Sequence, residues 1–257
     1  RRSGAISRRR WERGSLSETP RVLITRPRQD AAPLAAQLKN GGVESSCAPM
    51  LEIRYLGTAN LPALDALQGL LFTSANGVRA FARRTTYRDI AVFAVGESTG
   101  REAEASGFAD VRVAGGNVER LSELVTANCD PAAGPLYHAA ASALAGDLSG
   151  SLAAQGFSVL HGVLYEAVAA SELPVQCRDD LKTEKFDAVL LFSPRTARTF
   201  VKLVSQAGLS HLLGGVTAVC LSDAVAAEVA GLNWRNVRTA SHPDQASLLE
   251  CLDWLTR

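Results

Sequence analysis

Short apolar runs alternate with amphipathic stretches along this chain, and each run is followed by a turn and a helical pattern. The order strand, helix, strand is read from residues 22–25, 31–40 and 43–49, and again from residues 136–137, 146–155 and 158–165. Strands that alternate with helices throughout a chain favour parallel sheets with helices packed on both faces. The pattern therefore predicts an α/β protein.

The pattern also repeats within the chain. Residues 71–81 read LFTSANGVRAF and residues 190–200 read LLFSPRTARTF, which match at an offset of 119. A second pair, residues 91–114 and residues 217–240, matches at an offset of 126. Because each repeat reads as a strand, a tight turn and a helix, the sequence predicts two α/β domains of similar build.

The repeats place polar residues at equivalent turns. Ser193 is placed to cap a helix whose first residue is Pro194, and Ser74 is placed to cap its counterpart. The second repeat pairs Gly96 with Ser222. Ligands of parallel α/β sheets bind beyond the carboxyl ends of the strands, so these turns predict a ligand cleft. For each residue alone, helix capping is the default role.

Composition narrows the class of protein. The chain is 47% apolar and 21% charged, and no segment approaches the roughly eighteen consecutive apolar residues of a membrane span. We expect a soluble, cytoplasmic protein that has no membrane partner. The cysteines and histidines lack the spacings of metal or redox motifs, so we expect reduced thiols and no metal site.

Charge is concentrated at the start of the chain. Residues 1–20 carry six arginines and two glutamates, a net of +4, and they lack apolar periodicity, which predicts a disordered basic tail. Subtracting +4 from the total of +1 leaves −3 for the remainder. An anionic ligand would therefore have to be held by local features of the fold.

The order and spacing of five motifs resemble the uroporphyrinogen-III synthase family, from residue 21 to the C-terminus. The motifs are ITRP at residues 24–27, FTSANGV at 72–78, AVGEST at 94–99, GVLYE at 162–166 and FSP at 192–194. The chain departs from the family pattern in the second domain's turn, where Ser222 replaces a glycine and Val225 a threonine. Arginines common after the strand at Leu136 are replaced by alanines at residues 139–141 and 143 and by Ser142. These departures leave the ligand contacts of both turns open.

The resemblance implies a particular architecture: two flavodoxin-like domains, each a parallel sheet flanked by helices, joined by a two-stranded connector. One domain would combine residues 21–50 with residues 168–257. The inserted domain would be residues 51–167. The connector strands would be residues 49–53 and 164–168.

The resemblance also implies an activity, the cyclisation of hydroxymethylbilane to uroporphyrinogen III in haem biosynthesis, with loss of water and inversion of ring D. No cofactor is expected. Hydroxymethylbilane is strongly anionic, and the free N–H groups of helix N-termini can hold its carboxylates. The family expectation is a monomer that binds no nucleic acid, and a transient contact with hydroxymethylbilane synthase stays open.

The resemblance places the site residues. Tyr165 and Thr99 are expected to act in catalysis, Tyr165 by hydrogen-bonding the departing hydroxyl group without being charged. The alternatives are an aromatic that fills space and a helix cap. The residues expected to bind substrate are Arg26, Thr73, Ser74, Ala75, Asn76, Gly96, Ser98, Ser193, Pro194, Arg195 and Ser222.

Two other classes of protein share parts of this pattern. A two-lobed small-molecule binding or sensor module would also have duplicated α/β domains, but the chain shows no helix-turn-helix region and its motifs match the synthase better. A nucleotide-dependent enzyme would need a phosphate-binding loop, and neither G-x-x-x-x-G-K-[ST] nor G-x-G-x-x-G opening a helix occurs.

Overall fold

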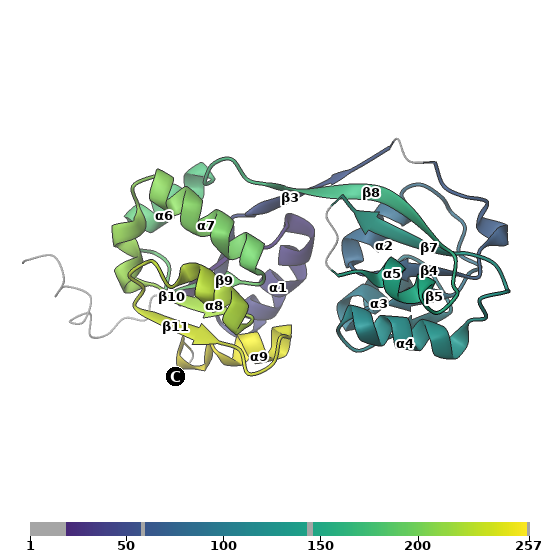
Figure 1. The fold of residues 1–257 in the computed structure, drawn as a ribbon. Helices are drawn as coiled ribbons and strands as arrows, with labels where there is room; N and C mark the ends of the chain where they lie inside the picture. The colour runs from purple at the N-terminus through teal and green to yellow at the C-terminus, as the bar shows by residue number, and fades with distance from the viewer. Residues whose placement is uncertain (1–18, 58–59, 143–145, 256–257) are drawn as a thin grey trace, which may run out of the picture. The chain divides into compact units, whose positions relative to one another are not determined.

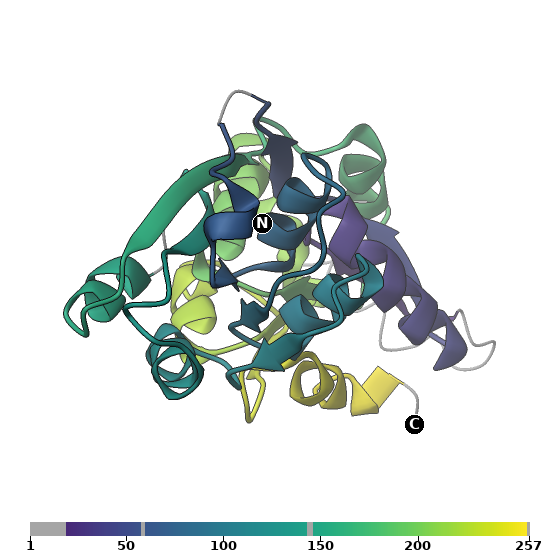
Figure 2. The same cartoon turned by 90° about the vertical axis from the view of Figure 1, so that its right-hand side faces the viewer.

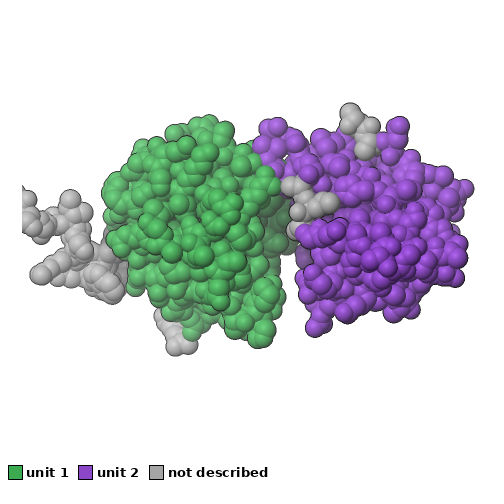
Figure 3. All heavy atoms as spheres, in the orientation of Figure 1, with its two compact units in different colours: residues 1–52, 169–257 green, residues 53–168 purple. Residues whose placement is uncertain are grey.

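The computed structural model describes residues 19–57, 60–142 and 146–255. The chain divides into two compact units (Figure 3): unit 1 is Arg1–Glu52 with Ala169–Arg257, and unit 2 is Ile53–Val168. Of the predicted basic tail, residues 1–18 lie outside the described residues. No helix of the described ranges is both long enough and apolar enough to cross a membrane.

Unit 1 contains a parallel sheet of five strands (Figure 1). Its strands are β1 (Arg21–Ile24), β2 (Glu44–Cys47), β9 (Ala188–Leu191), β10 (Thr217–Cys220) and β11 (Asn236–Thr239). They lie in the order β2-β1-β9-β10-β11, and all four neighbouring pairs are parallel. Counted along the unit this is the order 2-1-3-4-5, which is the flavodoxin-like arrangement.

Helices cover both faces of this sheet (Figures 1 and 2). They are α1 (Arg28–Asn40), α6 (Val175–Lys182), α7 (Pro194–Gln206), α8 (Asp223–Val229) and α9 (Gln245–Glu250), with 3-10 turns at Ser210–Gly215 and Asp253–Leu255. One core joins α6, α7 and α8 to the sheet, and the other joins α1 and α9 to the opposite face. Two buried apolar layers hold the unit together.

Unit 2 repeats the arrangement with a different chain order. Its elements are β3 (Leu51–Tyr55), a 3-10 turn at Leu64–Ala66, β4 (Gly69–Phe72), α2 (Ala75–Ala82), β5 (Val92–Ala94), α3 (Glu97–Ala105), β6 (Val111–Val113), α4 (Val118–Asn128), β7 (Leu136–Ala141), α5 (Leu148–Ala153) and β8 (Val159–Ala169). The spatial order β8-β7-β4-β5-β6 is parallel throughout. In unit 2, β4, β5 and β6 occupy the places of the third, fourth and fifth strands of unit 1. The strands that occupy the places of the first and second, β7 and β8, come last in the chain.

The cores of unit 2 are also layered on both faces of its sheet. The side of α2 and α3 buries an aromatic cluster that includes Phe72, Phe81 and Tyr137, and the side of α4 and α5 buries Leu71, Leu121 and Leu148 among others. The predicted class, parallel sheets flanked by helices, is confirmed for both units.

The chain passes from one unit to the other within β3 and β8. These strands are neighbours in the sheet of unit 2. Hydrogen bonds from Leu56 N to Leu164 O (2.8 Å) and from Ala170 N to Met50 O (3.0 Å) bracket the pair, so the two strands run antiparallel. The contact boundaries fall at 52/53 and 168/169.

Five of the elements predicted by range differ in length from the prediction, among them β2, which is shorter, and β7, which is longer. Helix α1 begins at Arg28, three residues before the predicted start, because the carbonyl of Pro27 accepts from the N–H groups of Asp30 and Ala31 at 3.0 Å. Helix α5 is shorter than predicted, and β8 extends to Ala169. Strand ends depend on the partner strand, which local patterns do not contain.

Candidate functional site

In unit 2 the two predicted turns lie side by side. Helices α2 and α3 begin directly after β4 and β5, which are neighbouring parallel strands. Ser74 caps α2, as the sequence predicts, and its Oγ accepts from Asn76 N at 3.2 Å. Gly96 is the N-cap residue of α3 and makes no side-chain cap. Two helix N-termini therefore open at one edge of this sheet, where their free N–H groups favour anions.

The remaining predicted residues of these turns differ in exposure. Thr73 and Ala75 are half-buried beside Ser74, and Ser98 is exposed in the first turn of α3. Thr99 is 5% exposed and Asn76 8%. The Asn76 Oδ1 accepts from Arg79 Nη1 at 3.1 Å, so its amide oxygen is engaged within the helix.

A β-bulge determines the position of Tyr165. Ala140 pairs with Val163 and Ala141 with Tyr165, so Leu164 is an extra residue in β8. Leu164 and Tyr165 both belong to the core on the α2 side, and Tyr165 is 6% exposed. The bulge brings the phenol into that core next to the carboxyl end of β7, where Ser142 N donates to Tyr165 O at 3.0 Å.

A histidine lies beside Thr73 on the face of the sheet toward α4 and α5. His138 of β7 is 3% exposed, and its Nε2 is 3.3 Å from Thr73 Oγ1. Its ring packs edge to face against that of His161, with 5.3 Å between the ring centroids. Burial, with a smaller effect of His161, lowers the pKa of His138 from 6.5 to about 4. The imidazole is therefore neutral at physiological pH.

Unit 1 has two equivalent turns, after β9 and β10. Ser193 caps α7, its Oγ accepting from Thr196 N at 3.2 Å, and Pro194 occupies the first turn as predicted. Ser222 precedes α8 and makes no side-chain cap. Ser193 and Ser222 follow β9 and β10, which are neighbouring parallel strands, while Arg195 is exposed.

Arg26 lies on the other side of Ser193, at the point where the strand order of unit 1 reverses. It follows β1, and its guanidinium is 4.5 Å above the ring of Phe192, with Nη1 donating to Gln245 Oε1 at 2.9 Å. Thr25 joins the two strands, because its hydroxyl donates to Leu190 O at 2.6 Å. Such reversal points are where doubly wound sheets bind ligands.

Four residues that shape these edges were not among the predicted site residues. They are Thr25, His138, Phe192 and Gln245. Thr25 and Phe192 lie within the motifs ITRP and FSP, and His138 is a polar residue inside the otherwise apolar run LYHAAA. All four acquire their roles through residues distant in the chain.

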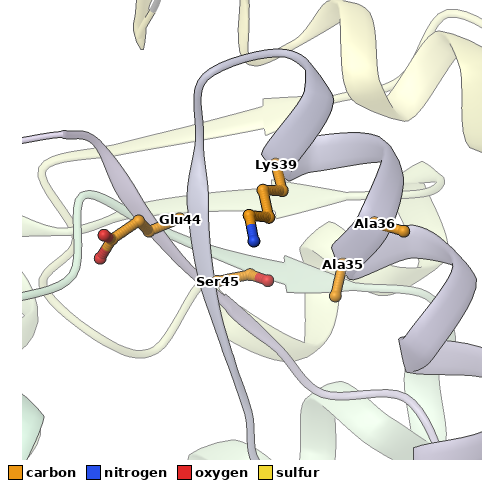
Figure 4. A pocket seen from close by; sticks show the side chains of 5 residues that line it. All are labelled: Ala35, Ala36, Lys39, Glu44 and Ser45. Atoms are coloured by element: carbon orange, nitrogen blue, oxygen red, sulfur yellow. The ribbon is translucent and has the colours of Figure 1, made fainter.

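Two further features are a surface pocket and the cysteines. The pocket of Figure 4 is lined by Ala35, Ala36, Lys39, Glu44 and Ser45, and it lies at the end of α1 and the start of β2, toward the amino edge of the sheet. The cysteines are all free, and burial raises the pKa of Cys177 and Cys220 to about 12, so both stay protonated. Within the described residues, no group of three or more His, Cys, Asp or Glu could hold a metal ion.

The chain is similar to one family throughout most of its length. Residues 32–250 match the family model described as Uroporphyrinogen-III synthase HemD. Over 207 residues the chain is 28% identical to the uroporphyrinogen-III synthase of Chlorobaculum parvum, which covers 74% of this chain and 81% of that protein.

Solved structures show a likeness of fold. The uroporphyrinogen-III synthetase of Helicobacter pylori 26695 is 16% identical, with a TM-score of 0.62, over 92% of this chain and 99% of that one. A mutant uroporphyrinogen III synthase from the extremely thermophilic bacterium Thermus thermophilus is also 16% identical, with a TM-score of 0.51, over 92% and 98% of the two chains.

Proposed function

Because the chain belongs to the uroporphyrinogen-III synthase family, we propose that it cyclises hydroxymethylbilane to uroporphyrinogen III. The match to the family model over residues 32–250 is the observation that carries this proposal. The reaction would make the chain a carbon–oxygen lyase of tetrapyrrole biosynthesis. It needs neither an oxidant nor a cofactor, because the substrate loses only water.

The substrate chemistry suits the two sheet edges. Hydroxymethylbilane carries its negative charge on carboxylates that are distributed along a flexible chain of pyrroles. Each unit offers two adjacent helix N-termini, after β4 and β5 in unit 2 and after β9 and β10 in unit 1. Backbone N–H groups at these turns can hold carboxylates even though the chain has a formal net charge of only +1.

We assign the predicted binding residues to these edges. In unit 2 they are Thr73, Ser74, Ala75, Asn76, Gly96 and Ser98, and in unit 1 they are Arg26, Ser193, Pro194, Arg195 and Ser222. The two arginines would pair with acetate or propionate groups. Arg26 is the better supported, because Phe192 and Gln245 restrict its guanidinium to one place.

The chemical steps require orientation more than strong acid or base groups. The hydroxyl group of the substrate leaves as water, and the methylene carbon becomes an electrophile that the substituted carbon of ring D attacks. The spiro intermediate then breaks its older bond and recloses at the free carbon of ring D, which loses a proton. The enzyme must favour this route over direct closure, which is catalysis by proximity and orientation.

Tyr165 is the residue we assign to the departing hydroxyl group, with Thr99 as a second hydrogen-bonding hydroxyl. A phenol can donate a hydrogen bond while it remains neutral. The bulge at Leu164 supports the assignment, because bulges often re-aim side chains next to active sites.

We further propose that the two units are the domains expected from the resemblance, residues 21–50 with 168–257 and residues 51–167. The contact boundaries at 52/53 and 168/169 support this division. A cytoplasmic monomer that receives its unstable substrate from hydroxymethylbilane synthase fits the proposed activity.

The test is a product assay. Purified protein is mixed with fresh hydroxymethylbilane, the products are oxidised, and the porphyrin isomers are separated by chromatography. We expect isomer III in excess over the isomer I that forms without enzyme. Isomer I alone, as in the blank, would refute the activity and leave a two-lobed binding module as the alternative.

A further inference from the structure

His138 and Thr73 meet where the strand order of unit 2 reverses. Strand β7 pairs with β4 in parallel, and His138 is opposite Leu71. Thr73 is two residues beyond Leu71, so its side chain points to the same face as His138. The two side chains come within 3.3 Å at this reversal, the place where a doubly wound sheet binds its ligand.

The surroundings of the imidazole decide where its proton lies. His138 Nδ1 is buried and has no hydrogen-bond partner within the described residues. A proton on Nδ1 would be a buried donor without an acceptor, which is unfavourable and rarer in proteins than an unpaired acceptor. A neutral imidazole carries one proton, so that proton belongs on Nε2.

This tautomer determines what the threonine hydroxyl can do. With the proton on Nε2, His138 donates and Thr73 Oγ1 accepts. The hydroxyl proton of Thr73 is then free for another acceptor. Thr73 is half-buried, and its contact with His138 is the one hydrogen bond of its side chain in the described structure.

We propose that His138 is a positioning residue that holds the Thr73 hydroxyl as a hydrogen-bond donor toward a carboxylate of the substrate. The inference rests on the proposed function for the identity of that carboxylate. With the proton on Nδ1, His138 Nε2 would instead accept the hydroxyl proton of Thr73. Thr73 Oγ1 would then present only lone pairs to the substrate, and lone pairs repel a carboxylate.

The start of α2 provides the second half of this carboxylate site. Ala75 is the first residue of the helix, and its N–H has no intrahelical acceptor. Gly77 lets the helix pack closely against β7, since a Cβ at this position would be 2.7 Å from Ala139 O. The strand that carries His138 therefore fixes the helix end as well as the hydroxyl group.

Unit 1 lacks this arrangement at the corresponding register. There Ile24 is opposite Leu190, and the residue two positions beyond is Phe192, over which Arg26 lies. At this position unit 1 has Phe192, whose ring supports the guanidinium of Arg26. Unit 2 has Thr73, which provides a hydroxyl donor. The two edges would recognise carboxylates by different groups.

The first experiment observes the tautomer without substrate. A long-range proton–nitrogen correlation spectrum of nitrogen-labelled protein at neutral pH, assigned with His138→Gln, should show the proton of His138 on Nε2. A proton on Nδ1 would overturn the inference even if the protein makes isomer III. The Nε2 tautomer in a protein that makes only isomer I would instead remove the proposed function.

The second experiment measures coupling between the two residues. Thr73→Val should raise the KM for isomer III formation roughly tenfold, the size expected for one hydrogen bond to a charged group, while Thr73→Ser should restore it. His138→Leu should raise KM similarly with a smaller effect on kcat, and His138→Gln, which keeps an N–H donor, should recover part of the loss.

The double variant distinguishes positioning from general structural damage. If His138 acts through Thr73, Thr73→Val with His138→Leu should have the KM of Thr73→Val alone. If the double variant instead showed the product of the two single effects on KM, His138 would act independently of Thr73, and the inference would be overturned. Thermal unfolding of each variant identifies any that do not fold, and the wild-type spectrum remains decisive in that case.

Discussion

Tyr165 shows how one inserted residue changes the surroundings of a functional group. Neighbouring residues in a strand normally point to opposite faces, yet Leu164 and Tyr165 share one core, because Leu164 is the extra residue of the bulge. The sequence identified Tyr165 through the string GVLYE. It could not identify the bulge, because a bulge is defined by the partner strand.

Tyr165→Phe tests the proposed role of the phenol. Phenylalanine keeps the ring in the core, so thermal unfolding should change little, whereas kcat for isomer III should fall roughly tenfold to a hundredfold, as for loss of one hydrogen-bonding group in catalysis. An unchanged kcat would limit Tyr165 to packing. Tyr55→Phe is a matched control from the same unit, on β3.

His138 should make the stability of unit 2 depend on pH. Its pKa is lowered from 6.5 to about 4, because burial and the neighbouring His161 disfavour the charged ring. Between these values the unfolded chain binds a proton that the folded chain does not, so stability falls as pH is lowered through this window. The loss should reach roughly 3 kcal/mol at pH 4.

Urea unfolding of the wild type and of His138→Leu at pH 7 and at pH 4 checks this prediction. The variant has no imidazole to protonate, so its stability should fall by less than that of the wild type. Equal losses in the two proteins would show that His138 is not the group responsible. Comparing differences removes the contribution of the carboxylates, which titrate in both proteins.

At the scale of single elements, the turns of the repeat were predictable because capping is local chemistry. Ser74 and Ser193 cap their helices as the sequence predicts. Gly77 was visible in the motif FTSANGV, but its reason was not: it makes room for the carbonyl of Ala139, a residue of another strand. The end of β8 was missed for the same reason, since it pairs with a distant strand, whereas α1 begins earlier through local bonds to the Pro27 carbonyl.

The two turns of unit 1 provide a matched pair of cap variants. Ser193→Ala removes the bond from Thr196 N and should lower stability by about 1 kcal/mol, whereas Ser222→Ala removes no cap and should cost much less. Urea unfolding followed by tryptophan fluorescence measures both. Equal losses would mean that the Ser193 cap contributes little. The isomer assay on the same variants shows whether either hydroxyl also contacts substrate.

At the scale of the whole molecule, the sequence predicted the duplication but not the different chain order of the strands in the two units. The matches at offsets of 119 and 126 indicated two similar domains. The sheets show that the units have the same spatial order and different chain orders, because β7 and β8 fill the positions that β1 and β2 fill in unit 1. The chain passes between the two units within β3 and β8.

The aromatic residues allow the unfolding of each unit to be followed separately. Trp234 and Trp254 belong to unit 1, whereas all four tyrosines, Tyr55, Tyr87, Tyr137 and Tyr165, belong to unit 2. Trp11, which lies outside the described residues, can be removed as Trp11→Phe. Tryptophan fluorescence then reports unit 1, and fluorine NMR of fluorotyrosine-labelled protein reports unit 2.

Gly162→Ala should destabilise unit 2 alone. A Cβ at Gly162 would collide with the hydroxyl of Tyr137, which is buried without a hydrogen-bond partner in the described structure. Overpacking of this kind costs about 1–3 kcal/mol. Gly57→Ala is the control in the same unit, because no atom of the described residues beyond its chain neighbours lies within 4 Å of the added carbon.

Each unit has its own sheet and its own pair of cores, so unfolding should not be two-state for the whole chain. In urea the tyrosine signals of Gly162→Ala should change at a lower midpoint than in the wild type. The tryptophan midpoint should stay in place, because the substitution touches no residue of unit 1. If the midpoints of both signals fell by the same amount, the two units would unfold as one cooperative structure. Strands β3 and β8 would then transmit the destabilisation from unit 2 to unit 1.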